Sequence, residues 1–356
     1  MRISIRWCLL AVLGFLLVAN VASALPYDWA MPYQHVNQHG GGYKFSIRSL
    51  AASQDGSDTL YYGHIQNAYD GILPDGTLNI VNIDPSTGAV LHYITVTAQP
   101  KALATDDRGY VYAGAGGTVN VYPGNLSSLT ASISVSGATA IEGVTVTQIG
   151  SDYFLYASNR GTGKVARYNI DNINSPVLDT TWATNGIYTL PTTDLRGVVT
   201  ADADGNLWVS DKTADRVYRI AADGLSHIYT TVDNPKDIAI CGDYAYVSTE
   251  KGDLSTVEQL FVSDMSLNQT LYDSMVNTGY GASHYGFGGI TILNGKVYVT
   301  DEDSLRIDGP SGYGDPTTHY LDRIYSIDIP CIPEPASIIA MLSGLSGLAL
   351  MRRLRK

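Results

Sequence analysis

Cysteine is scarce in this sequence, which contains only Cys8, Cys241 and Cys331 among its 356 residues. None of the three stands in a Cys-x-x-Cys or Cys/His spacing of the kind that binds zinc or cycles a disulfide. Between residues 25 and 329 there is also no stretch in which apolar residues recur at helical spacing. These absences exclude a disulfide-rich scaffold, a cysteine-ligated metal domain and a helical bundle.

Residues 1–24 have the pattern of a secretory signal peptide. A basic start is followed by an apolar run at 7–18 and by small residues at 22–24, which suit a cleavage site. Cleavage there removes Cys8 and leaves Cys241 and Cys331 in an oxidising compartment. A disulfide bond between these two requires their Cα atoms to come within about 7 Å. We therefore expect an exported protein.

The segment 330–356 contains three parts in order. Pro333, Glu334 and Pro335 form a short motif, residues 336–351 are uncharged, and the chain ends with Arg352-Arg353-Leu354-Arg355-Lys356. This order resembles the PEP-CTERM sorting signal, which exosortases recognise in exopolysaccharide-producing bacteria. The resemblance implies an exosortase-like processing enzyme as a partner, and retention in the cell envelope or at the cell surface.

The uncharged part of this tail has its own physical reading. As a helix, residues 336–351 span roughly 24 Å. That is shorter than the ~30 Å hydrocarbon core, so the segment suits a transient transmembrane helix that holds the protein before processing. The basic end stays on the cytoplasmic side. An ordinary C-terminal tail anchor is the alternative, but it gives no reason for the Pro-Glu-Pro motif.

Positively charged residues are also scarce in this sequence. Without residues 1–24 and 336–356 the chain loses six of its 22 basic residues and none of its 34 acidic ones, so its net charge is 16 − 34 = −18. So acidic a body is not expected to bind nucleic acid or anionic lipid headgroups. Solubility is the simpler explanation of the acidity.

A phrase of small-residue strand, turn and aromatic strand recurs along residues 25–329, most clearly at 195–211. Six copies, at spacings of 53, 41, 54, 40 and 52 residues, have first strands that open at Arg48, Lys101, Glu142, Arg196, Lys236 and Gly288. Four strands fit in each spacing, so the sequence predicts an all-β, six-bladed β-propeller. The phrase pattern resembles the NHL-type and gluconolactonase-type propellers. The last copy lacks a fourth strand, and we expect the segment 29–38 to supply it and close the ring.

Four of the six first-strand residues are cationic, and all six are expected to surround one mouth of the central channel. A cationic ring in an acidic body would concentrate anionic groups such as uronates, phosphates or sulfates. Glu142, between Lys101 and Arg196 in blade order, is expected to bridge both. The alternative is a self-neutralising ring, in which the cations pair with Asp70, Asp194 or Asp237.

Three long connections, 66–77, 274–287 and 303–320, are expected on the same face as this mouth. They belong to consecutive blades and are rich in aromatic and imidazole groups. The candidate sugar-binding residues in them are Tyr280, His284, Tyr285, Tyr313 and His319. Disordered decoration is the alternative.

The gluconolactonase resemblance implies a divalent metal held in the channel by Glu, Asn and Asp side chains. Only Glu142 matches such a ligand here, because the corresponding positions of the other blades hold Lys, Arg or Gly. We therefore expect no channel metal and no cofactor. Asp301 and Asp303 are the candidates for weak calcium binding. The Asp-x-Asp-Gly-Asn sequence at 202–206 fits a hairpin turn better than a calcium loop.

No catalytic motif is found. We therefore expect a non-catalytic protein of the cell envelope or surface that binds exopolysaccharide or another envelope component. The alternative is a secreted propeller hydrolase or lyase that acts on matrix carbohydrate or a lactone, through His284, His319 or Glu142.

Overall fold

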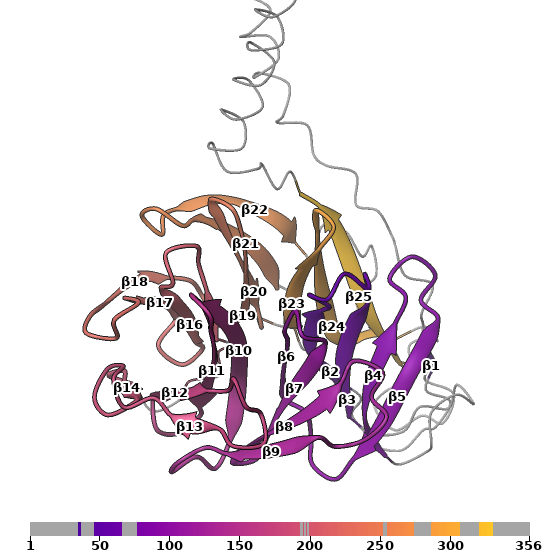
Figure 1. The fold of residues 1–356 in the computed structure, drawn as a ribbon. Helices are drawn as coiled ribbons and strands as arrows, with labels where there is room; N and C mark the ends of the chain where they lie inside the picture. Colours follow the sequence, from indigo (N-terminus) through magenta and orange to yellow (C-terminus); the bar gives the residue numbers. More distant parts are fainter. Residues whose placement is uncertain are drawn as a thin grey trace, which may run out of the picture.

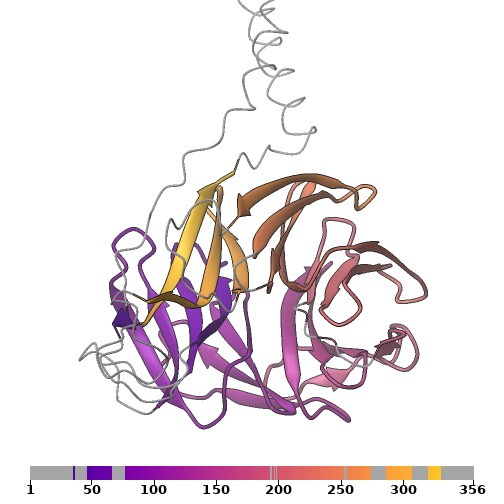
Figure 2. The same ribbon diagram turned by 180° about the vertical axis from the view of Figure 1, so that it is seen from behind.

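The computed structural model describes residues 35–36, 46–65, 77–192, 195, 197, 199–251, 255–273, 286–306 and 320–329. In these ranges the protein is all-β, with no helix, and six antiparallel sheets follow one another around a central axis. In Figure 1 the colours pass round the ring in sequence order, and Figure 2 shows the same ring from behind. The predicted six-bladed β-propeller is confirmed.

The blades follow the predicted order, each from its innermost strand outward. Blade 1 comprises β2 (Ser46–Ala52), β3 (Leu60–Ile65), β4 (Leu78–Ile83) and β5 (Val90–Val96). Blade 2 comprises β6 (Ala102–Thr105), β7 (Tyr110–Ala115), β8 (Thr118–Pro123) and β9 (Ala131–Ser134). Blade 4 comprises β15 (Val199–Ala201), β16 (Leu207–Asp211), β17 (Arg216–Ile220) and β18 (His227–Thr231), and blade 5 comprises β19 (Pro235–Cys241), β20 (Tyr244–Thr249), β21 (Thr256–Phe261) and β22 (Leu267–Asp273).

Blade 6 joins the two ends of the propeller. Its strands are β23 (Gly286–Leu293), β24 (Lys296–Arg306), β25 (Tyr320–Asp328) and the N-terminal β1 (His35–Val36). β1 pairs antiparallel with β25, with His35 opposite Asp322. The prediction that a segment within 29–38 closes the last blade is therefore confirmed.

Blade 3 departs from the common plan in its outer strand. β10 (Ile141–Ile149), β11 (Asp152–Asn159) and β12 (Lys164–Asn169) are regular, but β12 pairs with both β13 (Val177–Leu178) and β14 (Ile187–Thr189). The chain between β13 and β14 leaves the sheet and packs on blade 4, where Trp182 Nε1 donates a hydrogen bond to Ala222 O at 3.1 Å. This excursion accounts for the 54-residue spacing of the third copy of the phrase.

The repeated phrase has a structural reason. In the second strand of each blade a buried aromatic ring is followed, two residues later, by a small residue that faces the next blade. The rings are Tyr61, Tyr112, Tyr156, Trp208, Tyr246 and Tyr298. The small residues are Gly63, Gly114, Ser158, Ser210, Ser248 and Thr300. A Cβ on Gly63 would lie 2.5 Å from Pro100 O, so blade 2 approaches too closely there for any side chain.

Three of the small residues also join neighbouring blades by hydrogen bonds. The hydroxyl groups of Ser158, Ser210 and Ser248 donate to the carbonyl oxygens of Gly197, Lys236 and Gly288 at 2.7, 2.7 and 2.8 Å. Gly197 lies just before the inner strand of the next blade, and Lys236 and Gly288 lie near the start of theirs. These bonds are buried, and each contributes about 1 kcal/mol. They hold the start of each of these inner strands against the second strand of the preceding blade.

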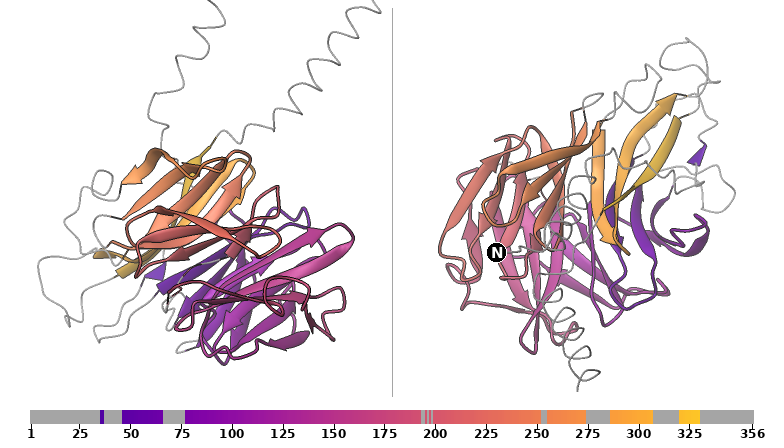
Figure 3. Two further views of the ribbon diagram at one scale, coloured as in Figure 1. Left: turned by 90° about the vertical axis from the view of Figure 1, so that its left-hand side faces the viewer. Right: turned by 90° about the horizontal axis from the view of Figure 1, so that it is seen from above.

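The ends of the inner strands define two faces of the propeller, whose stacked sheets are seen from the side and from above in Figure 3. We call the end at which the inner strands begin the mouth face. The turn between β23 and β24 lies at the opposite face, where Ile329 N donates a hydrogen bond to Gly295 O at 2.9 Å. The described chain therefore leaves the propeller on the face opposite the mouth.

Candidate anion-binding mouth of the central channel

Two positions in a blade bring charged side chains to the mouth face. One is the start of the inner strand, which holds Lys101, Glu142 and Lys236. The other is the residue just after the second strand, which holds Arg160, Lys212 and Glu250. The inner strand begins and the second strand ends at the same face because the two are antiparallel. We call these six residues the mouth cluster.

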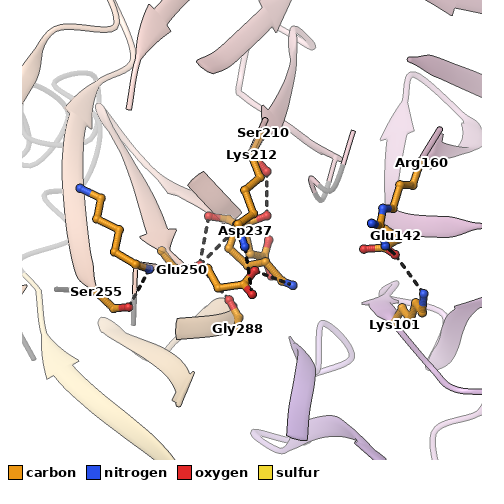
Figure 4. A network of polar contacts seen from close by, with 12 residues as sticks. Lys101, Glu142, Arg160, Ser210, Lys212, Asp237, Glu250, Ser255 and Gly288 are labelled. Atoms are coloured by element: carbon orange, nitrogen blue, oxygen red, sulfur yellow. Dashed lines mark hydrogen bonds and ion pairs between the residues drawn. The ribbon is translucent and has the colours of Figure 1, made fainter. Parts of the chain in front are cut away.

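Glu142 is the centre of the first half of the mouth cluster (Figure 4). Its Oε1 lies 3.0 Å from Lys101 Nζ and 3.1 Å from Arg160 Nη1. Lys101 comes from blade 2, whereas Glu142 and Arg160 come from blade 3, so the contacts cross the boundary between these blades. The Glu142 side chain is only 7% exposed, whereas those of Lys101 and Arg160 are 25% and 34% exposed.

Glu250 is the centre of the second half. Its Oε1 lies 3.1 Å from Lys212 Nζ, and its Oε2 lies 3.3 Å from Lys236 Nζ. Lys212 belongs to blade 4 and the other two to blade 5, so this half joins a second pair of blades. Lys236 is buried, which differs from the solvated ring expected from the sequence. In Figure 4 the groups around Glu142 and Glu250 are seen as two separate sets.

Both carboxylates are held in the ionised form. Burial on its own raises the pKa of Glu142, but the hydrogen bond and charge of Lys101 and the charges of Lys236 and Arg160 outweigh it, so the pKa is lowered. Burial likewise raises the pKa of Glu250, and the charges of Lys236 and Lys212 bring it below its ordinary value. A carboxylate flanked by two cations is stable as an anion at neutral pH.

The six side chains of the mouth cluster include four cations and two carboxylates, which sum to 4 − 2 = +2, and the Asp237 carboxyl group lies next to Lys236. The Glu142 carboxylate also lies deeper than the Lys101 and Arg160 groups that contact it. Around Glu142 a solute approaching the mouth face therefore meets cationic groups before it meets the carboxylate. Around Glu250 the order is mixed, because the Lys212 side chain is more exposed than that of Glu250 and the Lys236 side chain is less exposed. In a body of net charge −18 the mouth cluster is a local concentration of positive charge.

The channel below the mouth cluster is of a different character. It contains a cavity of about 200 Å³ that is lined by aliphatic and threonine side chains of inner strands, among them Leu103, Val144, Thr145 and Ile238. Within the described part of the chain, the lining has no charged side chain. Charged groups of a ligand would therefore stay at the mouth, where the cations are.

The structure brings together three of the residues chosen from the sequence, Lys101, Glu142 and Lys236. Arg48 lies in β2 next to a β-bulge and is half-buried. Arg196 lies outside the described residues, and so do Tyr280, His284, Tyr285, Tyr313 and His319. Pro333, Glu334 and Pro335 lie outside them as well.

Glu142 contacts Lys101, as expected, and also Arg160. Its expected contact with Arg196 stays a prediction, because Arg196 lies outside the described residues. Of the carboxylates considered as neutralising partners of the cations, Asp70 and Asp194 lie outside the described residues. The oxygens of Asp237 accept backbone N–H groups from Ile238 and from Ile290 of blade 6, and the charge of Lys236 acts on this carboxyl group. Burial raises the pKa of Asp237 to about 7, although these bonds and the charge of Lys236 lower it.

Sequence reasoning missed Arg160, Lys212 and Glu250. A signal for them exists, because each stands two residues after the serine that joins its blade to the next, in the pattern aromatic-x-Ser-x-charged. The aromatic residue and the serine of this pattern predict the second strand of a blade, and the charged residue that follows lies on the mouth face.

No metal site is found in the described part of the chain, where no group of three or more His, Cys, Asp or Glu side chains lies close enough to hold an ion. Asp301 and Asp303 fall in β24, but their side chains lie outside the described residues. Asp202 closes a hairpin turn, as predicted, because its Oδ1 accepts the backbone N–H groups of Asp204 and Asn206.

Cys241 is disulfide-bonded. It packs against a core cluster that includes Ile329, two residues before Cys331. Cys331 and Cys8 both lie outside the described residues, so the pairing of Cys241 with Cys331 stays a prediction. The described ranges contain no helix of the length and apolarity needed to cross a membrane, and the predicted transmembrane helix at 336–351 lies outside them.

No protein-family model and no curated protein matches this chain. Two solved structures resemble it in fold. A chain of a nidogen/laminin complex has 13% identity and a TM-score of 0.49, with 63% of this chain and 79% of that chain covered. A protein of unknown function from Bacteroides caccae has 12% identity and a TM-score of 0.49, with 62% and 78% covered. At these values the likeness says nothing about what this chain binds.

Proposed function

We propose that this protein is an exported, envelope-retained β-propeller that binds anionic groups of an extracellular polysaccharide at the mouth cluster. The observation that carries the proposal is the layering of charge, in which Lys101 and Arg160 lie nearer the solvent than the Glu142 carboxylate they contact. Within the mouth cluster the cations outnumber the carboxylates, and ammonium and guanidinium groups suit a uronate, sulfate or phosphate group.

Export and retention rest on the two ends of the sequence. In this proposal residues 1–24 are removed on secretion, residues 25–329 form the propeller, and residues 330–356 are a PEP-CTERM-type sorting signal that an exosortase-like enzyme processes. The described chain leaves the propeller at Ile329, on the face opposite the mouth. A protein held through its C-terminal segment would therefore present the mouth cluster away from the membrane, toward the matrix.

The alternative, a hydrolase or lyase acting on matrix carbohydrate or a lactone, gains no support from Glu142. A general acid must carry a proton near neutral pH, and the neighbouring cations lower the pKa of this carboxyl group. Its Oε1 is also occupied by Lys101 and Arg160. The other residues of this alternative, His284 and His319, lie outside the described residues. We therefore propose binding at the mouth cluster as the function.

The test is the affinity of purified residues 25–332, which keep Cys331, for oligomers of galacturonic acid, measured by calorimetry. Replacing Lys101 and Arg160 by Gln together removes two exposed cations, and we expect affinity to fall about tenfold. Lys296→Gln is the matched control, because it removes one cation at the opposite face. Equal affinities for the double variant, the control and the unmodified protein would refute binding at the mouth.

Retention is tested separately by the intact mass of the cell-surface protein. The proposal expects a chain that lacks residues 1–24 and most of the residues after Pro335. Surface material that keeps the basic end at 352–356 would leave an ordinary tail anchor as the explanation.

A further inference from the structure

An exposed aromatic and guanidinium cluster lies on the outer rim between blades 3 and 4, at the left of Figure 1. We call it the rim cluster, and its members are Tyr188, Arg216, Tyr218, His227 and Tyr229. Tyr188 belongs to β14 of blade 3, and the others belong to β17 and β18 of blade 4. The rim cluster is made of residues outside the mouth cluster and the central channel.

The cluster is held rigidly by the excursion that splits the outer strand of blade 3. Trp182, in the excursion, is buried under blade 4 and contacts the ring of Tyr188 at a centroid distance of 6.3 Å. Tyr188 Oη lies 2.7 Å from His227 Nδ1, and the His227 ring packs edge-on against Tyr218 at 5.4 Å. The split outer strand of blade 3 thus positions Tyr188, which in turn contacts His227.

Tyr229 and Arg216 form the outer surface. Tyr229 lies beside Tyr218 at 5.7 Å and is 51% exposed. The Arg216 guanidinium carbon lies 4.2 Å from the centre of the Tyr229 ring, and Arg216 Nη1 lies 3.3 Å from Tyr218 Oη. Among the described residues no carboxylate forms an ion pair with Arg216, but the charge of Asp211, its cross-strand partner in β16, acts on it.

Arg167 shows what a structural arginine looks like in the same region. It also stacks on aromatic rings, at 4.6 Å from Phe154 and 5.4 Å from Trp182, but it is shielded from solvent and forms an ion pair with Asp179. The charge of Arg167 is therefore neutralised by Asp179 within the fold. The Arg216 charge is partly exposed, next to an exposed ring, and its hydrogen bond is to a neutral hydroxyl group.

We propose that the rim cluster is a second saccharide-binding site, which takes one uronic acid residue of a polysaccharide. A tyrosine face supplies apolar area that matches the C–H face of a pyranose ring. A planar guanidinium offers paired donors that match a carboxylate. The site goes beyond the proposed function, because none of its residues belongs to the mouth cluster and it does not need the mouth cluster to bind anything.

The experiment uses residues 25–332, which keep Cys331, with both Lys101→Gln and Arg160→Gln, so that the mouth cluster is weakened. Affinity for galacturonic acid oligomers, and for galactose oligomers of equal length, is measured by calorimetry. We expect Tyr229→Ala to lower the galacturonate affinity about fivefold, because the stacking surface is lost. Arg216→Gln should lower it by a similar factor and abolish the preference for galacturonate over galactose.

Two variants serve as controls for these effects. Tyr93→Ala removes a 41% exposed tyrosine from β5, the outer strand of blade 1, and should change nothing. Tyr229→Phe keeps the ring and should bind like the parent protein. Thermal unfolding of each variant shows whether the fold is intact.

The outcomes separate this proposal from the proposed function. If galacturonate affinity is lost with the mouth variants and Tyr229→Ala has no further effect than Tyr93→Ala, the rim site is refuted and the mouth stands. If binding survives the mouth variants and is lost with Tyr229→Ala, the rim site stands and the mouth is refuted. Equal affinity for the two oligomers in the parent protein refutes a uronate site on the rim.

Discussion

Replacing Glu142 by Gln should make the protein less stable and, at the same time, a stronger binder of anions. The side chain keeps its size and an acceptor oxygen but loses its charge, so Lys101 and Arg160 lose their shared counter-charge. The local sum of the mouth cluster rises from 4 − 2 = +2 to 4 − 1 = +3. Stability and affinity should therefore change in opposite directions.

The expected changes in unfolding free energy and in anion affinity both follow from the geometry. Breaking a fully buried ion pair costs about 3–5 kcal/mol, but here both cations are partly exposed and can be rehydrated, so we expect a loss of about 1–2 kcal/mol. One added unit of charge about 7 Å from a bound anion contributes roughly 0.6 to 2.4 kcal/mol at effective dielectric constants of 80 to 20. A gain of about 1 kcal/mol corresponds to about fivefold tighter binding.

The assay pairs urea unfolding with calorimetric titration of galacturonic acid oligomers. Glu258→Gln is the matched control, because it removes the same charge from β21, where the carboxylate accepts hydrogen bonds from two threonine hydroxyl groups. The gain in affinity should be present at low salt and absent at 1 M salt, where the screening length is about 3 Å. A Glu142→Gln protein that is less stable but binds no better than Glu258→Gln would show that the mouth cluster only holds blades together.

Three further predictions concern other parts of the fold. Burial raises the pKa of Asp237 to about 7, above about 3.9 in the unfolded chain, so between these values the folded protein binds a proton that the unfolded chain does not. The free energy of unfolding should therefore fall as the pH rises from about 4 to 7, and urea unfolding across this range measures the fall. An equal dependence on pH in Asp237→Asn would contradict the prediction. Ser210→Ala removes the hydrogen bond to Lys236 O, and should lower the free energy of unfolding by about 1 kcal/mol; an unchanged urea midpoint would show that this bond contributes nothing. Unreduced, unfolded mature protein should contain no free thiol, and Cys241→Ser should contain one and be about 4 kcal/mol less stable; two thiols in the unmodified protein would refute a bond to Cys331.

The fold could be predicted from the sequence because its main determinant is local and repeated. An aromatic residue followed two positions later by a small one recurs in every second strand, and the short strands around it have ordinary turn signals. Closure by β1 followed from the missing fourth strand of blade 6. The excursion around Trp182 was not predicted, because its contact with Ala222 joins segments 40 residues apart and leaves no periodic trace.

The mouth cluster was predicted only in part, for a similar reason. The first residues of the inner strands could be compared with one another, so Lys101 and Lys236 were found. Glu142 was predicted with them as a partner of Lys101, whereas Arg160, Lys212 and Glu250 stand after the second strand, at a position outside that comparison. Glu250 is the clearest case, because it pairs with Lys212 of another blade.

Salt dependence of saccharide binding tests the central claim most directly. The affinity of residues 25–332 for galacturonic acid oligomers and for galactose oligomers of equal length should be measured at low, physiological and high ionic strength. Binding at a cationic mouth predicts a clear preference for galacturonate at low salt that shrinks steadily as salt is added. Equal affinities for the two oligomers, unchanged by salt, would contradict it.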